Sequence, residues 1–409
     1  MASFSIALTG LQADTVALNT IGNNLSNLNT TAFKEQTTTF EDLFYQQIGM
    51  SGANDPLQVG VGTKVSGTAT NFLQGSMSTT GDSRDMAISG NGFFVVQQGG
   101  VQALTRAGNF QLDSQGNLTT VNGERVMGYG AANGVVNVNG GLVPLTVPVG
   151  VNEAAQATQN FSVTANLNAG ATTGTQFTTP VTMYDSLGQS HAVTVTYTKS
   201  GANTWNYAVT LPGADATGTP VNNTGTLTFD SAGKLVTPAA NVTGISFPTL
   251  TNGASDLTFN WNLYDSSGAP TIGQSTAASS TTGTSQDGFA SGTYQSFSVD
   301  SSGVISASFS NGHTANIGQV AVATVTNPEG LTMIGNNDFA ATASSGLPSI
   351  GVAGTGGRGT IEDSALEQSN VDISVEFADL IVAQRAFQAN SKTVTTFDSV
   401  TQDTIGMIR

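Results

Sequence analysis

The chain has 409 residues, which is more than one hydrophobic core usually organises, so we expect two or three domains. Its formal net charge of −16 and its charged fraction of only 9% argue against nucleic acid as a partner and favour an extracellular or assembled protein. The chain has no cysteine, which excludes disulfides, thiol catalysis and thiolate metal sites, and no apolar run long enough for a membrane helix, so we expect no membrane insertion.

The first predicted element is an amphipathic helix at the N-terminal end. Apolar residues recur there at steps of three and four, the spacing of a heptad seam, at Phe4, Ala7, Leu11, Leu18, Ile21, Leu25 and Leu28. Asp14 interrupts this seam, and residues 27–31 should end the helix. Asp14 is the one charged residue before Lys34, so copies of the helix could lie side by side without repulsion. The same lack of basic residues argues against a cleaved secretory signal peptide.

The middle of the chain has a β pattern. The tetrapeptide Asp-Ser-x-Gly occurs five times, each time after alternating apolar residues, beginning at Asp113, Asp185, Asp230, Asp265 and Asp300. Asp at the first position and Gly at the fourth suit a hairpin turn with a glycine bulge. Because the spacings between the five copies are uneven, we interpret them as recurring turns and not as a repeat architecture.

Two changes in composition suggest where the β region divides. Residues 144–153 contain two prolines, and residues 273–288 are rich in Ser, Thr and Gly, so we interpret both as connectors. The segment between them carries aromatic residues for a core of its own, namely Trp205, Tyr207, Phe259 and Trp261.

The last predicted element is a second amphipathic helix. Residues on one face recur every seven positions, at Ile373, Leu380, Phe387, Val394, Thr401 and Ile408, with Phe377, Ala383, Phe397 and Ile405 between them. Asp372 is a suitable N-cap, and Glu376 in the first turn suits the helix dipole. Helices with such narrow apolar stripes are marginal alone, so we expect further copies of the chain to cover them.

These elements predict a mainly β fold with two β domains, the outer one inserted in the inner one. Long N- and C-terminal α-helices would form a coiled-coil-like assembly domain. The predicted division assigns 1–72 to the first helix and its connecting segment, 73–146 and 285–363 to the middle β domain, 147–284 to the outer domain, and 364–409 to the C-terminal helix.

We find no sequence signature of a catalytic, cofactor or metal site. His191 and His313 each lack a nearby second ligand, which favours packed or surface histidines. The glycines of residues 354–359 match a dinucleotide fingerprint, but no buried strand precedes them, and Glu362 and Asp363 follow where positive potential is needed. We therefore interpret that segment as a flexible loop before the last helix.

Several stretches resemble the signatures of bacterial flagellar rod and hook proteins, in the order in which that family carries them. They are Leu11-Gln-Ala13, Ile21-Gly-Asn-Asn-Leu-Ser-Asn27, Thr31-Ala-Phe-Lys34, Ser89-Gly-Asn-Gly-Phe-Phe-Val-Val96, Thr105-Arg-Ala-Gly-Asn-Phe110, Leu366-Glu-Gln-Ser-Asn-Val-Asp372 and Gln384-Arg-Ala-Phe-Gln-Ala-Asn390. The stretch Val181-Thr-Met-Tyr-Asp-Ser-Leu-Gly188, followed by His191-Ala-Val-Thr-Val195, is similar to the outer domain of the family's hook members, which the shorter distal rod proteins lack. Ala32 stands where the family often has Gly, and Leu104 replaces a usual aromatic residue.

The resemblance implies a structural subunit and no enzyme, with no cofactor. Copies would polymerise into a curved hollow tube that acts as a universal joint between rod and filament. The implied partners are the chain itself, the rod, the hook cap, the hook–filament junction proteins and the flagellar type III export apparatus. The implied location is the extracellular part of the flagellum, reached without a cleaved signal peptide. A rod or junction subunit, or an exported β-rich adhesin, remains an alternative, although an adhesin would not need heptads at both ends.

From the heptads and the resemblance together we predict a set of residues at the interface between subunits. They are Leu11, Leu18, Ile21, Asn23, Asn24, Leu25, Asn27, Leu28 and Phe33 near the start, and Ile373, Phe377, Leu380, Gln384, Phe387, Asn390, Val394 and Phe397 near the end.

Overall fold

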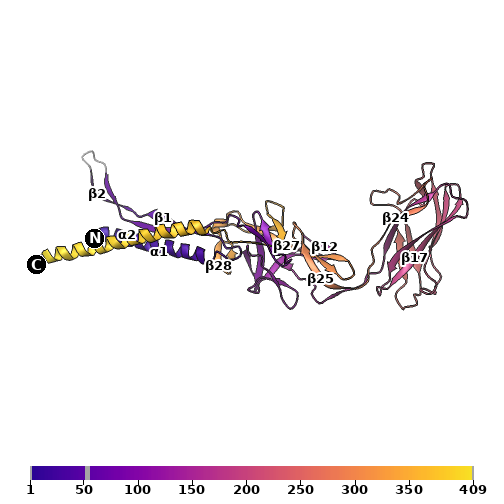
Figure 1. Ribbon diagram of the computed structural model, residues 1–409, viewed down its shortest axis with the longest axis horizontal. Coiled ribbons are helices and arrows are strands. Elements are labelled where there is room, and N and C mark those ends of the chain that lie inside the picture. Colours follow the sequence, from indigo (N-terminus) through magenta and orange to yellow (C-terminus); the bar gives the residue numbers. More distant parts are fainter. Residues whose placement is uncertain (1, 51–55, 408–409) are drawn as a thin grey trace. The chain divides into compact units, whose positions relative to one another are not determined.

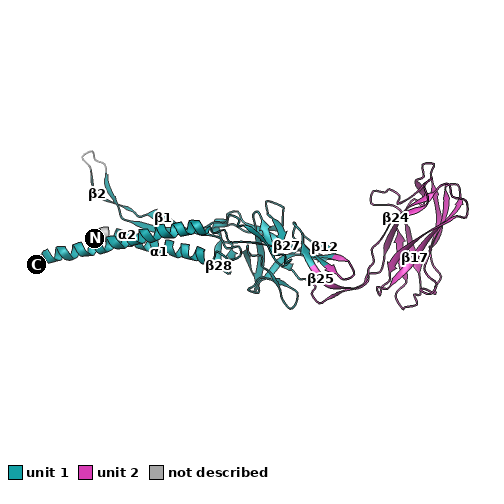
Figure 2. Cartoon of the chain, viewed as in Figure 1, with its two compact units in different colours: residues 1–147, 297–307, 315–409 teal, residues 148–296, 308–314 magenta. Residues whose placement is uncertain are grey.

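The computed structural model describes residues 2–50 and 56–407, and side chains from Ser5 onward in the first helix. The predicted seam positions Phe4 and Ile408 lie outside the described side chains. The chain divides into two compact units (Figure 2). Unit 1 comprises residues 1–147, 297–307 and 315–409, and unit 2 comprises residues 148–296 and 308–314. Neither helix in the described part of the chain is long and apolar enough to span a membrane.

Unit 1 contains the two predicted helices, α1 (Ala2–Ser26) and α2 (Ile373–Met407), which lie side by side (Figure 1). Asp372 caps α2 as predicted, because its Oδ1 accepts hydrogen bonds from the N–H groups of Ser374 (2.7 Å) and Val375 (3.2 Å). Next to α1, strand β1 (Gln36–Asp42) pairs antiparallel with β4 (Thr63–Thr70). Strand β2 (Tyr45–Met50) pairs with β3 (Pro56–Gly60) in a hairpin whose described residues are all exposed.

The β part of unit 1 is built on a mostly antiparallel sheet. Its strand order is β27-β11-β7-β8-β29-β28, from Thr314–Thr324, Arg125–Ala132, Phe93–Gln98, Val101–Thr105, Asp338–Ala340 and Thr332–Gly335. Phe93, Leu104 and Phe339 form the centre of its apolar core, with Phe72 packed against them. Leu104 itself is 4% exposed and belongs to this core.

Short elements complete unit 1. They are β5 (Met77–Thr79), β6 (Met86–Ser89), β9 (Gln111–Leu112), β10 (Leu118–Thr119), β12 (Val135–Val136), β13 (Val143–Pro144), the 3₁₀ turn η1 (Pro328–Gly330), β30 (Ser349–Val352), β31 (Thr360–Asp363) and β32 (Ala365–Glu367). Two of the pairings matter below, because β31 pairs with β6 and β32 pairs with β5, which ties the chain before α2 to the β body.

Unit 2 is a sandwich of two sheets. One has the order β16-β17-β18-β19-β20, from Gln176–Tyr184, Ser190–Gly201, Thr204–Thr210, Thr224–Phe229 and Leu235–Thr237. The other contains β21 (Val242–Phe247), β22 (Leu257–Trp261), β15 (Asn160–Asn168), β23 (Ile272–Ser275) and β24 (Ser280–Gln286). Burial alternates along β17 with the period of two that a half-buried strand requires. The predicted aromatic core is confirmed, since Trp205, Tyr207, Phe259 and Trp261 are all buried together.

Three further strands lie at the border of the two units. Strand β14 (Asn152–Glu153) pairs with β25 (Gly292–Val299), and the division between the units falls within β25 and β26 (Val304–Phe309). The prediction of a mainly β fold, with one β unit inserted in another and a helix at each end, is confirmed.

All five Asp-Ser-x-Gly segments form the predicted turn. In each, the Asp side chain accepts hydrogen bonds from the N–H groups two and four residues later, at 2.8–2.9 Å. In each, the glycine N–H also donates to the Asp carbonyl at 2.9–3.0 Å. The five glycines have φ between 77° and 84°, the left-handed region that glycine adopts at little cost. The hydrogen bonds that define each turn therefore involve only five consecutive residues, from the Asp to the residue after the Gly.

Two sequence interpretations are wrong. Residues 273–288 are not a connector, because they contain β24, which pairs antiparallel with β15. Most of β24 is exposed on both faces, so it lacks the alternating apolar residues that identify a strand. The glycine-rich residues 354–359 are not a flexible loop before the last helix but a hydrogen-bonded turn between β30 and β31. There the Arg358 side chain folds back onto the carbonyl groups of Ser349 and Thr355.

Candidate assembly surface

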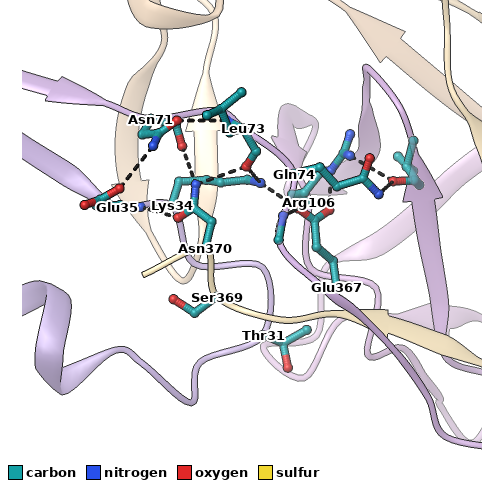
Figure 3. Close-up of polar contacts among 12 residues, drawn as sticks. Thr31, Lys34, Glu35, Asn71, Leu73, Gln74, Arg106, Glu367, Ser369 and Asn370 are labelled. Carbon is teal, nitrogen blue, oxygen red and sulfur yellow. Dashed lines mark hydrogen bonds and ion pairs between the residues drawn. The ribbon is translucent and has the colours of Figure 1, made fainter. Parts of the chain in front are cut away.

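A buried ion cluster joins the N-terminal segment, the β body and the segment before α2 (Figure 3). Lys34 Nζ lies 2.6 Å from Glu367 Oε1, and Arg106 Nε lies 2.7 Å from Glu367 Oε2. The three side chains are only 2%, 6% and 1% exposed for Lys34, Arg106 and Glu367. Phe33, which precedes Lys34 in the sequence, is also buried. Both cations therefore share the Glu367 carboxylate, whose single negative charge offsets one of their two positive charges.

Backbone groups satisfy the remaining donors and acceptors of the cluster. Lys34 Nζ donates to the Leu73 carbonyl (2.8 Å), and Glu367 Oε1 accepts the Gly75 N–H (2.9 Å). The Arg106 guanidinium donates to the carbonyl groups of residues 88, 90 and 92. Burial alone would raise the pKa of Glu367, but the charges of Arg106 and Lys34 hold that pKa below its usual range. The cluster therefore keeps Glu367 ionised and fixes the geometry of three chain segments.

The Asn370 side chain connects the same segments by hydrogen bonds to backbone groups. Its Oδ1 accepts the Glu35 N–H (2.8 Å), and its Nδ2 donates to the carbonyl groups of Asn71 (2.8 Å) and Leu73 (3.0 Å). These bonds are drawn in Figure 3. A half-buried amide with three backbone partners specifies how the chain leaves α1 and enters α2.

The turn after α1 keeps a left-handed residue although it lacks glycine. Ala32 has φ 57° and is buried, and its N–H donates to the Glu367 carbonyl at 2.9 Å. A non-glycine residue in this region is held there at a cost by its surroundings. The turn therefore has the left-handed conformation that glycine favours, although it carries alanine.

Asn24 connects α1 to β1 and to α2. Its Oδ1 accepts the Gln36 N–H (3.0 Å), and its Nδ2 donates to the Gln36 carbonyl (2.8 Å) and to Glu376 Oε1 (2.8 Å). Asn24 is 1% exposed, and Phe33 is also buried within the chain. We therefore correct their assignment to the interface between subunits: Asn24 belongs to this internal junction, and the side chain of Phe33 is buried within its own chain.

Replacing Asn24 by Ala should lower the free energy of unfolding of unit 1 by about 2–3 kcal/mol, because the buried Glu376 carboxylate and two backbone groups of half-buried Gln36 lose their partner. The neighbouring Asn23 is exposed, so Asn23→Ala is a matched control that should change stability by less than about 0.5 kcal/mol. Chemical denaturation followed by far-ultraviolet circular dichroism measures both. Equal losses in the two variants would contradict the role of Asn24.

The two helices meet through small and polar residues. Ala7 and Ala13 are buried, and a side-chain carbon added at Gly10 would lie 2.7 Å from Asn390 Nδ2. Asn390 Nδ2 donates to Asp14 Oδ2 at 2.8 Å, so the residue that interrupts the predicted seam makes a contact between the helices. The close approach of small residues leaves the larger apolar side chains on other faces of the helix pair.

Most of the predicted interface residues therefore remain accessible on unit 1. The exposed ones are Asn23, Ile373, Phe377, Gln384 and Phe387, and the half-buried ones are Leu11, Leu18, Ile21, Leu25, Asn27, Leu28, Leu380, Asn390, Val394 and Phe397. Further exposed apolar residues lie along α2 at Val375, Ile381, Val382, Val400 and Ile405, and on the β2–β3 hairpin at Tyr45, Ile48, Met50, Leu57 and Val59. We call the exposed apolar residues of α2, with Ile373, Phe377 and Phe387 included, the α2 apolar face, and they lie on several sides of the helix. Several exposed large apolar side chains on one helix are typical of a protein interaction site.

Sequence reasoning missed the ion cluster and the histidine contacts. Lys34 and Glu367 stand within recognised motifs, but their 333-residue separation hides their pairing. In unit 2, His191 Nε2 lies 3.0 Å from Asp185 Oδ2 and its Nδ1 lies 3.0 Å from Asp215 Oδ2. His313 stacks on Phe289 and lies 2.7 Å from Glu153 Oε1. His191 is packed and His313 is half-buried, in line with the prediction of packed or surface histidines. No group of three or more acidic or histidine side chains in the described residues is arranged to hold a metal ion.

Comparisons with known proteins cover the whole length of the chain. Four family descriptions match: flagella basal body rod protein (residues 4–34), flagellar hook protein FlgE/F/G D1 domain (87–166), flagellar basal body protein FlaE D2 domain (164–289) and flagellar basal body rod FlgEFG protein C-terminal (362–407). The chain is 35% identical to the flagellar hook protein FlgE of Escherichia coli, over 97% of this chain and 98% of that protein. It is 32% identical to the flagellar hook protein FlgE of Treponema pallidum over the full length of both. A crystal structure of Helicobacter pylori flagellar hook protein FlgE2 shares the fold over 71% of this chain and all of that one, with a TM-score of 0.56 at 17% identity.

Proposed function

This chain belongs to the flagellar hook protein FlgE family, and we propose that it polymerises through its terminal helices into a curved hollow tube that transmits torque from the rod to the filament. As a member of that family it is a structural subunit of the bacterial flagellar hook. The observation that carries the polymerisation proposal is the α2 apolar face. Burying one large apolar side chain there would contribute about 1.5–3 kcal/mol. A second copy that covers several of these side chains would therefore supply enough free energy to order the terminal helices of both copies.

The ion cluster supports a mechanical role for the same region. A tube that transmits torque needs a stiff connection between its helices and its β domains. Lys34, Arg106 and Glu367 supply fixed bonds between these parts within unit 1. Pairing of β32 with β5 adds main-chain hydrogen bonds to the same connection. Twisting the helices relative to the β body of unit 1 would have to break buried charge pairs, which is costly.

Several finer parts of the function are proposals of the same kind. We propose that the chain contacts rod, hook cap and hook–filament junction proteins, that the flagellar type III apparatus exports it without a cleaved signal peptide, and that it catalyses no reaction. We also propose that boundaries after residues 72, 146, 284 and 363 separate the terminal helices, the middle domain and the outer domain as functional parts. These proposals rest on the membership of the chain in this family, which supports a location in the flagellum.

Electron microscopy of the concentrated full-length chain tests the polymerisation proposal. We expect curved tubes from the wild type, and we expect Phe387→Asp to abolish them, because a charge would replace an apolar side chain on the α2 apolar face. Gln388→Asp adds the same charge at the next, polar and exposed position and should leave tubes intact. Straight rods would favour a rod or junction subunit, and wild-type monomers at every concentration would contradict the proposal.

A further inference from the structure

An acidic groove lies between α1, β1 and α2 in unit 1. Its volume is ≈ 360 Å³, and its acidic lining residues are Asp14, Glu35, Glu376 and Asp379. Among the described residues, no basic side chain lines it. Asp14 and Glu35 already accept hydrogen bonds from Asn390 and Asn71. Glu376 and Asp379, three residues apart on α2, are the two carboxyl groups that this groove leaves for a further partner.

One oxygen of Glu376 lacks a partner although it is buried. Glu376 is 3% exposed and its Oε1 accepts Asn24 Nδ2, but among the described residues nothing donates to its Oε2. Leaving a buried carboxylate oxygen without a donor is costly. Burial raises the pKa of Glu376, and a hydrogen bond with the Glu35 carboxyl group, together with the charges of Glu35 and Asp379, raises it further. A cation placed in the groove would satisfy this oxygen and offset the repulsion.

The candidate basic residue stands on the same helix but is not among the residues that line the groove. Arg385 follows Glu376 by nine residues, which is about two and a half helical turns and so about half a circle around the axis of α2. Arg385 is exposed and forms no ion pair with a described residue; its Nη1 donates only to Gln388 Oε1, at 3.2 Å. Arg385 is therefore outside the groove lining of its own chain and is accessible to a copy that packs against this side of α2.

We propose that the Arg385 guanidinium of one copy enters the acidic groove of the next copy and bridges Glu376 Oε2 and Asp379. A planar guanidinium suits two carboxylates, and it reaches farther into a groove than a compact ion does. A metal ion fits less well, because the described residues hold no group of three or more ligands arranged for one. Because the cation of each copy enters the groove of the next copy, the proposed contact is heterologous and propagates from copy to copy into a helical polymer. This inference rests on the proposed polymerisation.

Charge exchange between copies tests the pairing. Arg385→Glu and Asp379→Lys should each raise the critical concentration for polymerisation of the full-length chain by on the order of tenfold or more, measured by sedimentation at low salt. The double variant, and an equimolar mixture of the two single variants, should return most of the way to the wild-type value, because each restores opposite charges across the contact. A misfolded chain cannot be rescued by mixing. Lys392→Glu and Asp403→Lys, which change the charge equally at other exposed positions of α2, are the matched controls.

The outcomes separate this inference from the function on which it rests. Tubes from the wild type that persist unchanged in Arg385→Glu, or a mixture without rescue, would overturn the pairing and leave the hook function standing. Arrest of wild-type assembly by a chelator, with Arg385→Glu unaffected, would replace the guanidinium by a metal ion. A wild-type chain that forms no polymer would overturn the proposed function itself.

Discussion

Replacing Glu367 by Gln is expected to lower the free energy of unfolding of unit 1 by about 3–5 kcal/mol, because Lys34 and Arg106 would remain buried without their shared counter-charge. Both tryptophans lie in unit 2, so tryptophan fluorescence reports on that unit while circular dichroism of the helices reports on unit 1. We expect the helical transition to move to lower denaturant and the fluorescence transition to stay in place.

Glu362 provides the control for this variant. It is an exposed carboxylate five residues earlier in the chain, so Glu362→Gln removes the same charge at little cost. The pH dependence gives a second check. Because the pKa of Glu367 is held below its usual range, its contribution is present above about pH 4.3 and is lost as the pH falls through the lower pKa of the folded state. The gap between wild type and Glu367→Gln should therefore shrink in acid, and a constant gap would contradict the ion cluster.

The features predicted from sequence are those whose causes lie within a few residues. The turn at Asp300 depends on its own side chain and on Gly303, and both can be read from four letters. The cap at Asp372 is equally local. The aromatic core of unit 2 followed from alternation within single strands, as in β17. The side chains of turns and caps, together with the period of the apolar residues, therefore indicated the secondary-structure elements and the fold class.

The features that sequence reasoning missed depend on pairs that only the folded chain brings together. Asp14 interrupts a heptad, and nothing near it indicates that Asn390, 376 residues later, donates to it. Asn24 stands among predicted interface residues, yet the backbone of Gln36 and the carboxylate of Glu376 take up its hydrogen bonds inside the chain. Periodicity identifies which residues share a face, but it does not say whether that face meets the same chain or another copy.

Removing the His191 side chain should have the second large effect, this time in unit 2. His191 is buried between Asp185 and Asp215, and carboxylates only accept hydrogen bonds, so the imidazole is held with a proton on each nitrogen. We expect His191→Leu to lower the free energy of unfolding of unit 2 by about 2–4 kcal/mol, measured by tryptophan fluorescence. The loss stays below that of an isolated buried charge, because Asp185 keeps donors from Asn252 and from the turn backbone.

The sign of the pH dependence identifies the cause of that loss. Burial lowers the pKa of His191, but the hydrogen bonds and charges of Asp185 and Asp215 more than offset burial and raise it above its usual range. A raised pKa means that the stabilisation is fully present below about pH 6.5 and disappears as the pH rises through the pKa of the folded state. The fluorescence transition of the wild type should therefore weaken on going from mildly acidic to alkaline buffer, and that of His191→Leu should not.

Two features of the chain keep this measurement specific. Burial beside Glu124 raises the pKa of Asp338 to about 7, which gives unit 1 a pH dependence in the same range, but Asp338 lies outside the unit that tryptophan fluorescence reports. His313 is the other histidine of the chain, and it is partly exposed, so His313→Leu should keep the slope that His191→Leu loses. A slope that persists without His191 would show that another group of unit 2 carries the proton, and would refute the doubly bonded imidazolium.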